Sequence, residues 1–164
     1  MRKIRYHYRC MMIIPCHCRL DRQSKNIDMT LQEAENAIVE EFSMYEEWLD
    51  KYEYLIELGK SLNDYPESAK TDDRLIKGCQ SRVWLDYRVE DGKVVFNADS
   101  DAIITKGIIS LLIGLYSGRT PKEILSSDFS VVEKIGLKEN LSPTRANGLV
   151  SMIAKIREIA SMNV

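Results

Sequence analysis

The residue with the most distinctive chemistry in this sequence is Cys79, which lies in the run KGCQSR over residues 77–82. Gly78 would let the backbone turn sharply beside the thiol, because a residue without a Cβ reaches conformations that other residues avoid. Lys77 and Arg82 add positive potential, which favours the thiolate, the nucleophilic form of cysteine. A free cysteine is also often only a small buried apolar residue. The run alone therefore leaves a reactive and a structural role for Cys79 equally open.

The two residues after the cysteine, Gln80 and Ser81, carry an amide and a hydroxyl that can donate hydrogen bonds. Donors fixed near a sulfur anion would stabilise it, much as an oxyanion hole stabilises developing charge. Polar residues are equally ordinary at the start of a strand. A supporting role for these two residues is therefore a hypothesis.

The residue types that are absent after position 28 narrow the chemistry of Cys79. Both histidines and the other three cysteines lie before that point: His7, His17, Cys10, Cys16 and Cys18. A cysteine hydrolase needs a nearby base, usually histidine. A dithiol oxidoreductase needs a resolving cysteine, and an iron–sulfur cluster needs several thiolates. A lone thiol can still accept a sulfur atom as a persulfide and surrender it, or act as a single-cysteine thiol peroxidase or redox sensor.

Residues 1–28 differ from the rest of the chain in their charge. They hold seven basic and two acidic residues, a net charge of +5, so the remaining chain carries −7 of the total of −2. The segment lacks the long apolar core of a signal peptide, and Cys16-His17-Cys18 is too tightly spaced for a usual zinc site. We expect a basic, disordered or dispensable extension. A nucleic-acid-binding arm is the alternative for a basic tail, but the acidic body disfavours it.

Residues 29–164 are expected to form one domain. The chain is 45% apolar and 29% charged, the composition of an ordinary globular protein. No apolar stretch approaches the roughly 18 residues that a membrane helix needs. We therefore expect a cytoplasmic protein that neither spans a membrane nor binds nucleic acid.

The first part of this domain is expected to be helical. Apolar residues recur every three or four positions over residues 29–45, and the glutamates, Glu35 among them, lie off that face. A second helix carries Trp48 and Tyr52 on one side and is expected to stop at Gly59. A long loop over residues 60–77 then leads to Cys79.

The rest of the domain combines a hairpin with further helices. Alternation over residues 83–89 and 93–96 about the turn at Asp91-Gly92 predicts a β-hairpin. Further helices are expected over 102–116, after the capping box at Thr120, over 129–135 and from Ser142 to about 162. The predicted fold class is α+β, with a small antiparallel sheet packed against several helices.

Several motifs in the chain resemble those of the SufE family of cysteine desulfuration proteins, which accept sulfur for iron–sulfur cluster assembly. The run over 48–59 is similar to the opening helix signature of that family, and residues 76–84 look like its active-cysteine motif. Later signatures follow in the family's order: Asp99-Ser100-Asp101-Ala102, Lys106-Gly107, Thr120-Pro121 and the run from Leu141 to Leu149. The resemblance covers roughly residues 31–160.

This resemblance implies an α+β domain like the U-type (IscU-like) cluster scaffolds, with Cys79 as the persulfide acceptor at the tip of a loop. It implies that sulfur comes from a SufS-like, pyridoxal-phosphate cysteine desulfurase, which the protein stimulates. The sulfur would pass to a SufBCD-like scaffold complex. Pyridoxal phosphate belongs to the partner, so the resemblance implies a sulfur carrier without a cofactor or metal of its own. A docking module that only modulates the desulfurase is a third hypothesis.

The chain departs from the family pattern at two points. Arg82 stands where the family more often has glutamine, and Thr144-Arg145-Ala146 replaces Ser-Arg-Ser. Arg145 matches a family position near the cysteine loop and is expected to support it, although an arginine is also ordinary at a helix start. The run 99–101 could line the site, but capping of the following helix is the favoured interpretation.

Overall fold

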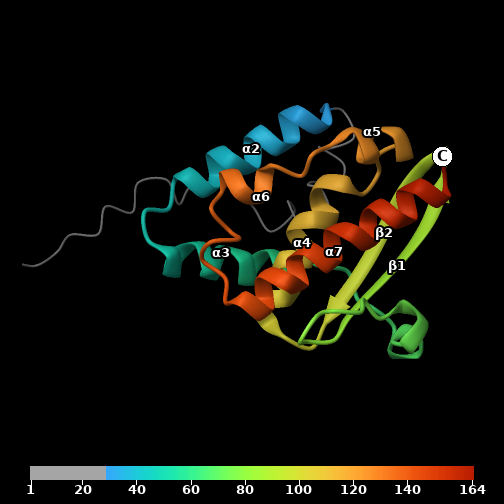
Figure 1. Ribbon diagram of the computed structural model, residues 1–164, viewed down its shortest axis with the longest axis horizontal. Coiled ribbons are helices and arrows are strands. Elements are labelled where there is room, and N and C mark those ends of the chain that lie inside the picture. The colour runs from blue at the N-terminus through green and yellow to red at the C-terminus, as the bar shows by residue number, and fades with distance from the viewer. Residues whose placement is uncertain (1–28) are drawn as a thin grey trace, which may run out of the picture.

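The computed structural model describes residues 29–164 (Figure 1). The predictions for residues 1–28, which include Cys10, Cys16 and Cys18, lie outside this range. The described elements are α2 (Leu31–Ser43), α3 (Trp48–Lys60), the 3-10 turns η2 (Glu67–Ala69) and η3 (Asp72–Arg74), β1 (Val83–Glu90), β2 (Lys93–Ser100), α4 (Ile103–Tyr116), α5 (Pro121–Ser126), α6 (Val131–Lys134) and α7 (Pro143–Met162).

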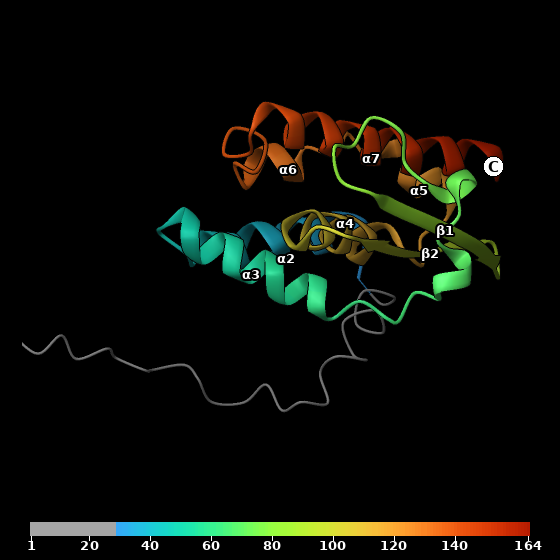
Figure 2. The same ribbon diagram turned by 90° about the horizontal axis from the view of Figure 1, so that it is seen from below.

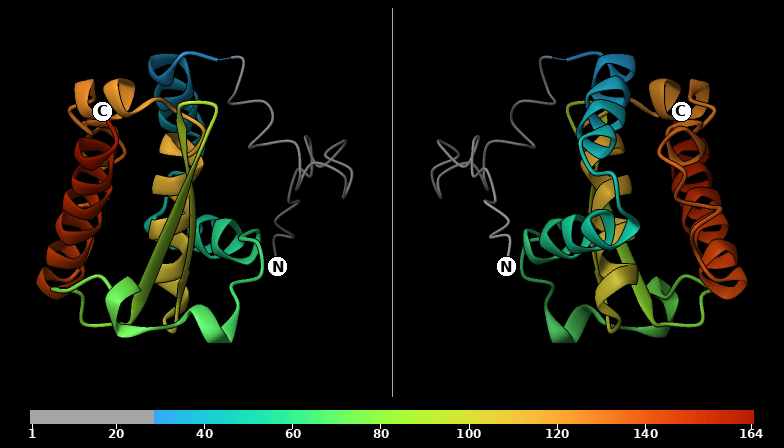
Figure 3. Two further views of the ribbon diagram at one scale, coloured as in Figure 1. Left: turned by 90° about the vertical axis from the view of Figure 1, so that its right-hand side faces the viewer. Right: turned by 90° about the vertical axis from the view of Figure 1, so that its left-hand side faces the viewer.

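Helix α4 and the hairpin form the middle of the molecule, with α7 on one side and α3 on the other (Figures 2 and 3). Ten of the 14 residues of α4 are buried, as its nearly continuous apolar sequence predicts. The strands β1 and β2 pair antiparallel and are the sheet of the described residues. The predicted α+β class is confirmed.

The role predicted for Gly59 is wrong, because α3 continues to Lys60. Gly59 instead lies where α3 crosses α4, opposite Gly107. A Cβ on Gly59 would stand 2.9 Å from the backbone nitrogen of Gly107, closer than real Cβ atoms approach. The two glycines therefore let the helix backbones meet, and a sequence pattern cannot distinguish this use of glycine from a helix stop.

The apolar periodicity places Glu35 off the apolar face of α2, yet the structure buries it. Its side chain is buried, and Oε1 accepts hydrogen bonds from the hydroxyls of Tyr116 and Ser127, each at 2.9 Å. The two donors offset the cost of burying the carboxylate. Glu35 thereby joins α2 to α4 and to the segment after α5.

The hairpin is longer than its alternation predicts. Asp91 (φ 49°) and Gly92 (φ 73°) form the turn, and β2 runs on to Ser100, which pairs with Val83. Residues 97–100 thus extend the strand. They do not cap α4, whose N-cap residue Ala102 makes no side-chain capping bond. The capping box at Thr120 and the helix that begins after Ser142 are as predicted.

Candidate functional site

Cys79 lies in a short loop that is closed at its base. The backbone nitrogen of Ile76 donates to the carbonyl of Val83 at 2.8 Å, and Leu75 forms a β-bridge with Trp84. Residues 77–82 therefore project from the start of β1. Gly78 has φ +92°, a conformation that other residues rarely adopt, so the predicted turn beside the thiol is present.

One side of this loop rests on α7. The thiol of Cys79 is half-buried, and its Sγ donates to the carbonyl oxygen of Gly148 at 3.6 Å. A Cβ added to Gly148 would stand 3.5 Å from that sulfur, and one added to Gly78 would stand 2.6 Å from Oγ of Ser151. The two glycines thus let the loop lie directly against the helix.

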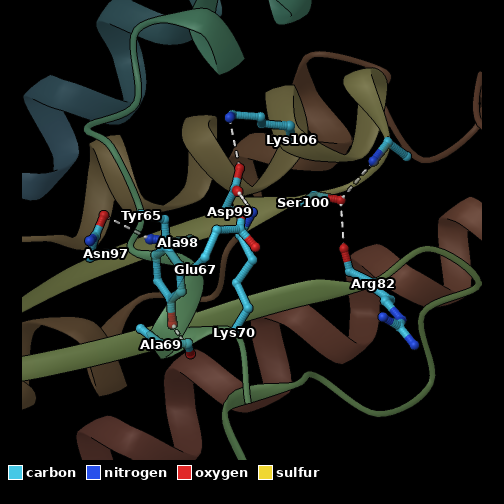
Figure 4. Close-up of polar contacts among 11 residues, drawn as sticks. Tyr65, Glu67, Ala69, Lys70, Arg82, Asn97, Ala98, Asp99, Ser100 and Lys106 are labelled. Atoms are coloured by element: carbon cyan, nitrogen blue, oxygen red, sulfur yellow. Dashed lines mark hydrogen bonds and ion pairs between the residues drawn. The ribbon is translucent and has the colours of Figure 1, made fainter. Parts of the chain in front are cut away.

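The other side of the loop is held by backbone hydrogen bonds. The amide of Arg82 donates to Oδ1 of Asp101 at 2.9 Å, and its carbonyl accepts from Oγ of Ser100 at 2.8 Å and from the amide of Asp101 at 3.3 Å. Figure 4 shows the Ser100 contact, with the Arg82 side chain pointing away from it. Ser100 and Asp101 therefore anchor the loop, which the capping interpretation did not anticipate.

Asp99 is the centre of an ion cluster beside this anchor. Its carboxylate pairs with Lys106 on α4 at 2.7 Å and with Lys70 before η3 at 3.0 Å (Figure 4). Burial opposes ionisation of Asp99, but the two ammonium groups outweigh it and hold the pKa of its carboxyl below the ordinary value. Lys70 also lies 5.4 Å from the ring centroid of Trp84, the strand partner of Asp99. The cluster ties the long loop before Cys79 to the sheet and to α4.

The thiol opens onto a small pocket with a cavity volume of about 10 Å³. That is about the least room that one water molecule needs. Three parts of the chain line it: Cys79, Gln80 and Ser81 from the loop, Thr105 and Ile108 from α4, and Thr144, Arg145, Gly148 and Met152 from α7.

The pocket does not favour the thiolate. Burial raises the pKa of Cys79 above the ordinary value for a thiol. The side chains of Lys77 and Arg82 are exposed, where water screens their charges. The prediction that these two residues promote the thiolate is wrong for this conformation.

The structure brings together most of the predicted supporting residues. Gln80, Ser81 and Arg145 line the pocket, although Gln80 and Arg145 are exposed. Gly78 turns the chain beside it. Arg82 contributes through its backbone, and its guanidinium is not part of the lining.

Sequence reasoning missed Thr105. Its side chain is buried, and Oγ1 donates to Oγ of Ser81 at 3.4 Å. The sequence could have pointed to it, because Thr105 is one of three polar residues, with Lys106 and Ser110, in the apolar run of α4.

The described residues contain no group of three or more His, Cys, Asp or Glu side chains that could hold a metal ion. Among the helices of residues 29–164, none is long and apolar enough to cross a membrane.

The chain is similar to known proteins over most of its length. Residues 36–160 match the family model described as "SufE: Fe-S metabolism associated domain". An uncharacterised SufE-like protein of Rhizobium etli is 41% identical over 130 residues, which cover 76% of this chain and 88% of the relative. One of Rhizobium meliloti is 41% identical over 128 residues, covering 75% and 91% respectively.

A solved structure supports the fold alone. It is the solution structure of a hypothetical protein from Thermus thermophilus, which is 20% identical and superimposes with a TM-score of 0.66 over 79% of this chain and 95% of its own. The matched family model spans the loop of Cys79, its anchor and the part of α7 that it contacts. The chain therefore belongs to the SufE family, whose domain is associated with iron–sulfur metabolism.

Proposed function

We propose that this protein is a sulfur carrier, and that Cys79 accepts sulfur as a persulfide from a pyridoxal-phosphate cysteine desulfurase of the SufS-like kind. The carrier stimulates that enzyme and delivers the sulfur to a SufBCD-like iron–sulfur scaffold complex. It needs no cofactor of its own. The observation that carries the proposal is the position of Cys79, the one thiol of residues 29–164, on a projecting loop within a SufE-family domain.

The transfer exchanges one sulfur–sulfur bond for another. The thiolate of Cys79 attacks the outer sulfur of a persulfide on the desulfurase, and a new bond forms between these two sulfur atoms. The bond between the two sulfurs of the desulfurase breaks, and its cysteine leaves as a thiolate. The proton that Cys79 released balances that leaving group, so no oxidant, reductant or histidine is required.

The resting thiol must leave its pocket for this reaction. Burial raises the pKa of Cys79, and the carbonyl of Gly148 accepts a hydrogen bond from the thiol, so both favour the protonated, less nucleophilic form in the pocket. The same facts disfavour the thiol peroxidase alternative, because peroxide also reacts with the thiolate. A carrier gains from this arrangement, since its thiol stays protected until a partner draws the loop outward.

The test uses the full chain with Cys10, Cys16 and Cys18 replaced by serine, so that Cys79 is the only thiol. This protein is incubated with a pyridoxal-phosphate cysteine desulfurase and L-cysteine, and intact mass spectrometry follows its mass. We expect a gain of one sulfur atom that a reductant removes and that Cys79→Ser abolishes while the thermal unfolding midpoint is retained. No gain with a desulfurase that demonstrably turns over and is stimulated by this protein would refute the carrier role. Stimulation that survives Cys79→Ser, with no mass gain in the parent, would establish the docking module instead.

A further inference from the structure

A buried hydroxyl of α4 lines the pocket of Cys79 and makes a long hydrogen bond to the Cys79 loop. Thr105 is 5% exposed, and its Oγ1 donates to Oγ of Ser81 at 3.4 Å. That separation is well beyond the 2.7–2.8 Å usual between two hydroxyls. Both side chains line the pocket of Cys79. The two hydroxyls are therefore only weakly bonded to each other in the resting state.

The chemistry of the pocket changes when Cys79 carries a second sulfur. The resting thiol is a hydrogen-bond donor, and the carbonyl of Gly148 on α7 accepts that hydrogen bond. A persulfide is more acidic than a thiol, and its anion has no proton to give. The carbonyl lone pairs then repel the sulfur, which instead needs hydrogen-bond donors. The loop and α4 offer such donors across the pocket.

We propose that the Ser81 hydroxyl donates a hydrogen bond to the outer sulfur of a persulfide on Cys79, and that Thr105 positions Ser81 by donating a hydrogen bond to its oxygen. The inference rests on the proposed function, because it assigns the bound state of the same pocket. The cavity volume of about 10 Å³ is about the least room that one water molecule needs, so a sulfur atom, which is larger, enters only if the loop shifts slightly outward. Thr105 uses its one O–H group to donate a hydrogen bond to the Ser81 oxygen, so the O–H group of Ser81 remains available to donate to sulfur.

The two hydroxyls act as a chain. A donor that is itself an acceptor becomes a stronger donor, so the bond from Thr105 strengthens the bond from Ser81 to sulfur. Donation to the anion stabilises it against protonation and lowers the pKa of the persulfide. Loss of either hydroxyl therefore raises that pKa, a readout that a purely structural role of Thr105 would not move.

The experiment loads the full chain, with Cys10, Cys16 and Cys18 replaced by serine, using inorganic polysulfide. The Cys79 thiolate attacks a polysulfide sulfur, one sulfur–sulfur bond replaces another, and a polysulfide shorter by one sulfur leaves. The rate of alkylation of the persulfide by iodoacetamide is then measured against pH by mass spectrometry. We expect the midpoint to rise by about one pH unit in Ser81→Ala and by about half a unit in Thr105→Val, the size of one hydrogen bond to an anion.

Three further variants test whether Thr105 affects the persulfide through Ser81. Thr105→Ser keeps the hydroxyl and is expected to restore the parent midpoint. The double variant Ser81→Ala, Thr105→Val is expected to shift no further than Ser81→Ala, because Thr105 acts through Ser81. Ser110→Ala removes another buried hydroxyl of α4, one that donates to the carbonyl of Leu58 at 2.7 Å outside the pocket, and is expected to leave the midpoint unchanged.

The inference is overturned if Thr105→Val keeps the parent midpoint, if Ser110→Ala shifts it equally, or if polysulfide leaves no sulfur on Cys79. Should Thr105→Val fail to fold, Thr105→Ala, which also removes the hydroxyl, takes its place with the same expected shift. Polysulfide loading requires no desulfurase. If the alkylation midpoints shift as expected but no sulfur is transferred from a desulfurase, the proposed function is refuted, whereas the roles of Ser81 and Thr105 toward a persulfide are supported.

Discussion

The two sides of the Cys79 loop are held in different ways. On the β2 side, the backbone of Arg82 makes three hydrogen bonds of 2.8 to 3.3 Å with Ser100 and Asp101. On the α7 side, Sγ of Cys79 donates one hydrogen bond to the carbonyl of Gly148 at 3.6 Å. Gly78 lies against Ser151 without a hydrogen bond between them. Thiols are weak hydrogen-bond donors, so the contact with α7 contributes much less than the anchor.

This difference indicates where the loop opens. We expect Cys79 and Gly78 to part from α7 while Arg82 stays fixed and the bond from Ile76 to Val83 keeps the base closed. The thiol can then reach a partner without loss of the hairpin. Segments with few strong contacts open at the least cost in free energy.

The largest effect is expected from Gly78→Ala. The change places a Cβ 2.6 Å from Oγ of Ser151 and forces alanine into φ +92°. A strained backbone of this kind costs about 1–3 kcal/mol, which the loop relieves by leaving α7. Iodoacetamide should label Cys79 about tenfold faster, since tenfold corresponds to about 1.4 kcal/mol of opening free energy.

Gly92→Ala is the matched control for this variant. Gly92 also has a positive φ, +73°, but nothing lies within 4 Å of an added Cβ. The hairpin turn would be strained by a similar amount, far from the thiol. Labelling of Cys79 should stay at the parent rate, measured by mass spectrometry in the chain with Cys79 as its only thiol. Equal acceleration in both variants would show that general destabilisation, and not contact with α7, exposes the thiol.

A smaller effect is expected from Asp101→Ala on the anchored side. The change removes the acceptor of the Arg82 amide, a bond of 2.9 Å at an exposed site. Since Ser100 still holds the Arg82 carbonyl, we expect labelling of Cys79 to rise by only about threefold, as for one weakened hydrogen bond. Asp101→Asn retains an oxygen acceptor and should stay near the parent rate. A greater effect here than in Gly78→Ala would reverse the assignment of the two sides.

The sequence was sufficient to predict the fold class because its strongest signals are local. The alternation in β1, the turn at Asp91 and the apolar run of α4 each follow from the neighbouring residues alone. The failures concern contacts between distant segments. Gly59 meets Gly107 across a helix crossing, and Glu35 is buried because Tyr116 and Ser127 come from elsewhere in the chain.

The candidate site likewise combines residues that the local sequence identifies with residues that only tertiary packing brings in. The loop motif around Cys79 is contiguous and could be recognised, whereas Gly148 and Thr105 reach the pocket only through the packing of α7 and α4. Charge near Cys79 in the sequence suggested a thiolate, but burial, which depends on tertiary structure, decides the direction of its pKa shift. Asp99 and Ser100 were misassigned because strand pairing with β1 overrode their capping propensity.

The smallest effect is a change in the pH dependence of labelling. Because burial raises the pKa of Cys79 in the folded protein, the labelling midpoint of the native chain should lie above that of the chain unfolded in urea. The sign for stability follows from linkage: the protonated thiol contributes fully below the unfolded pKa, and its contribution is lost as the pH rises through the folded one. Gly78→Ala, by freeing the thiol from α7, should move the native midpoint down toward that of the unfolded chain. An unchanged midpoint in that variant would mean that the thiol remains buried without its α7 contact. The α7 side would then not be the side on which the loop opens.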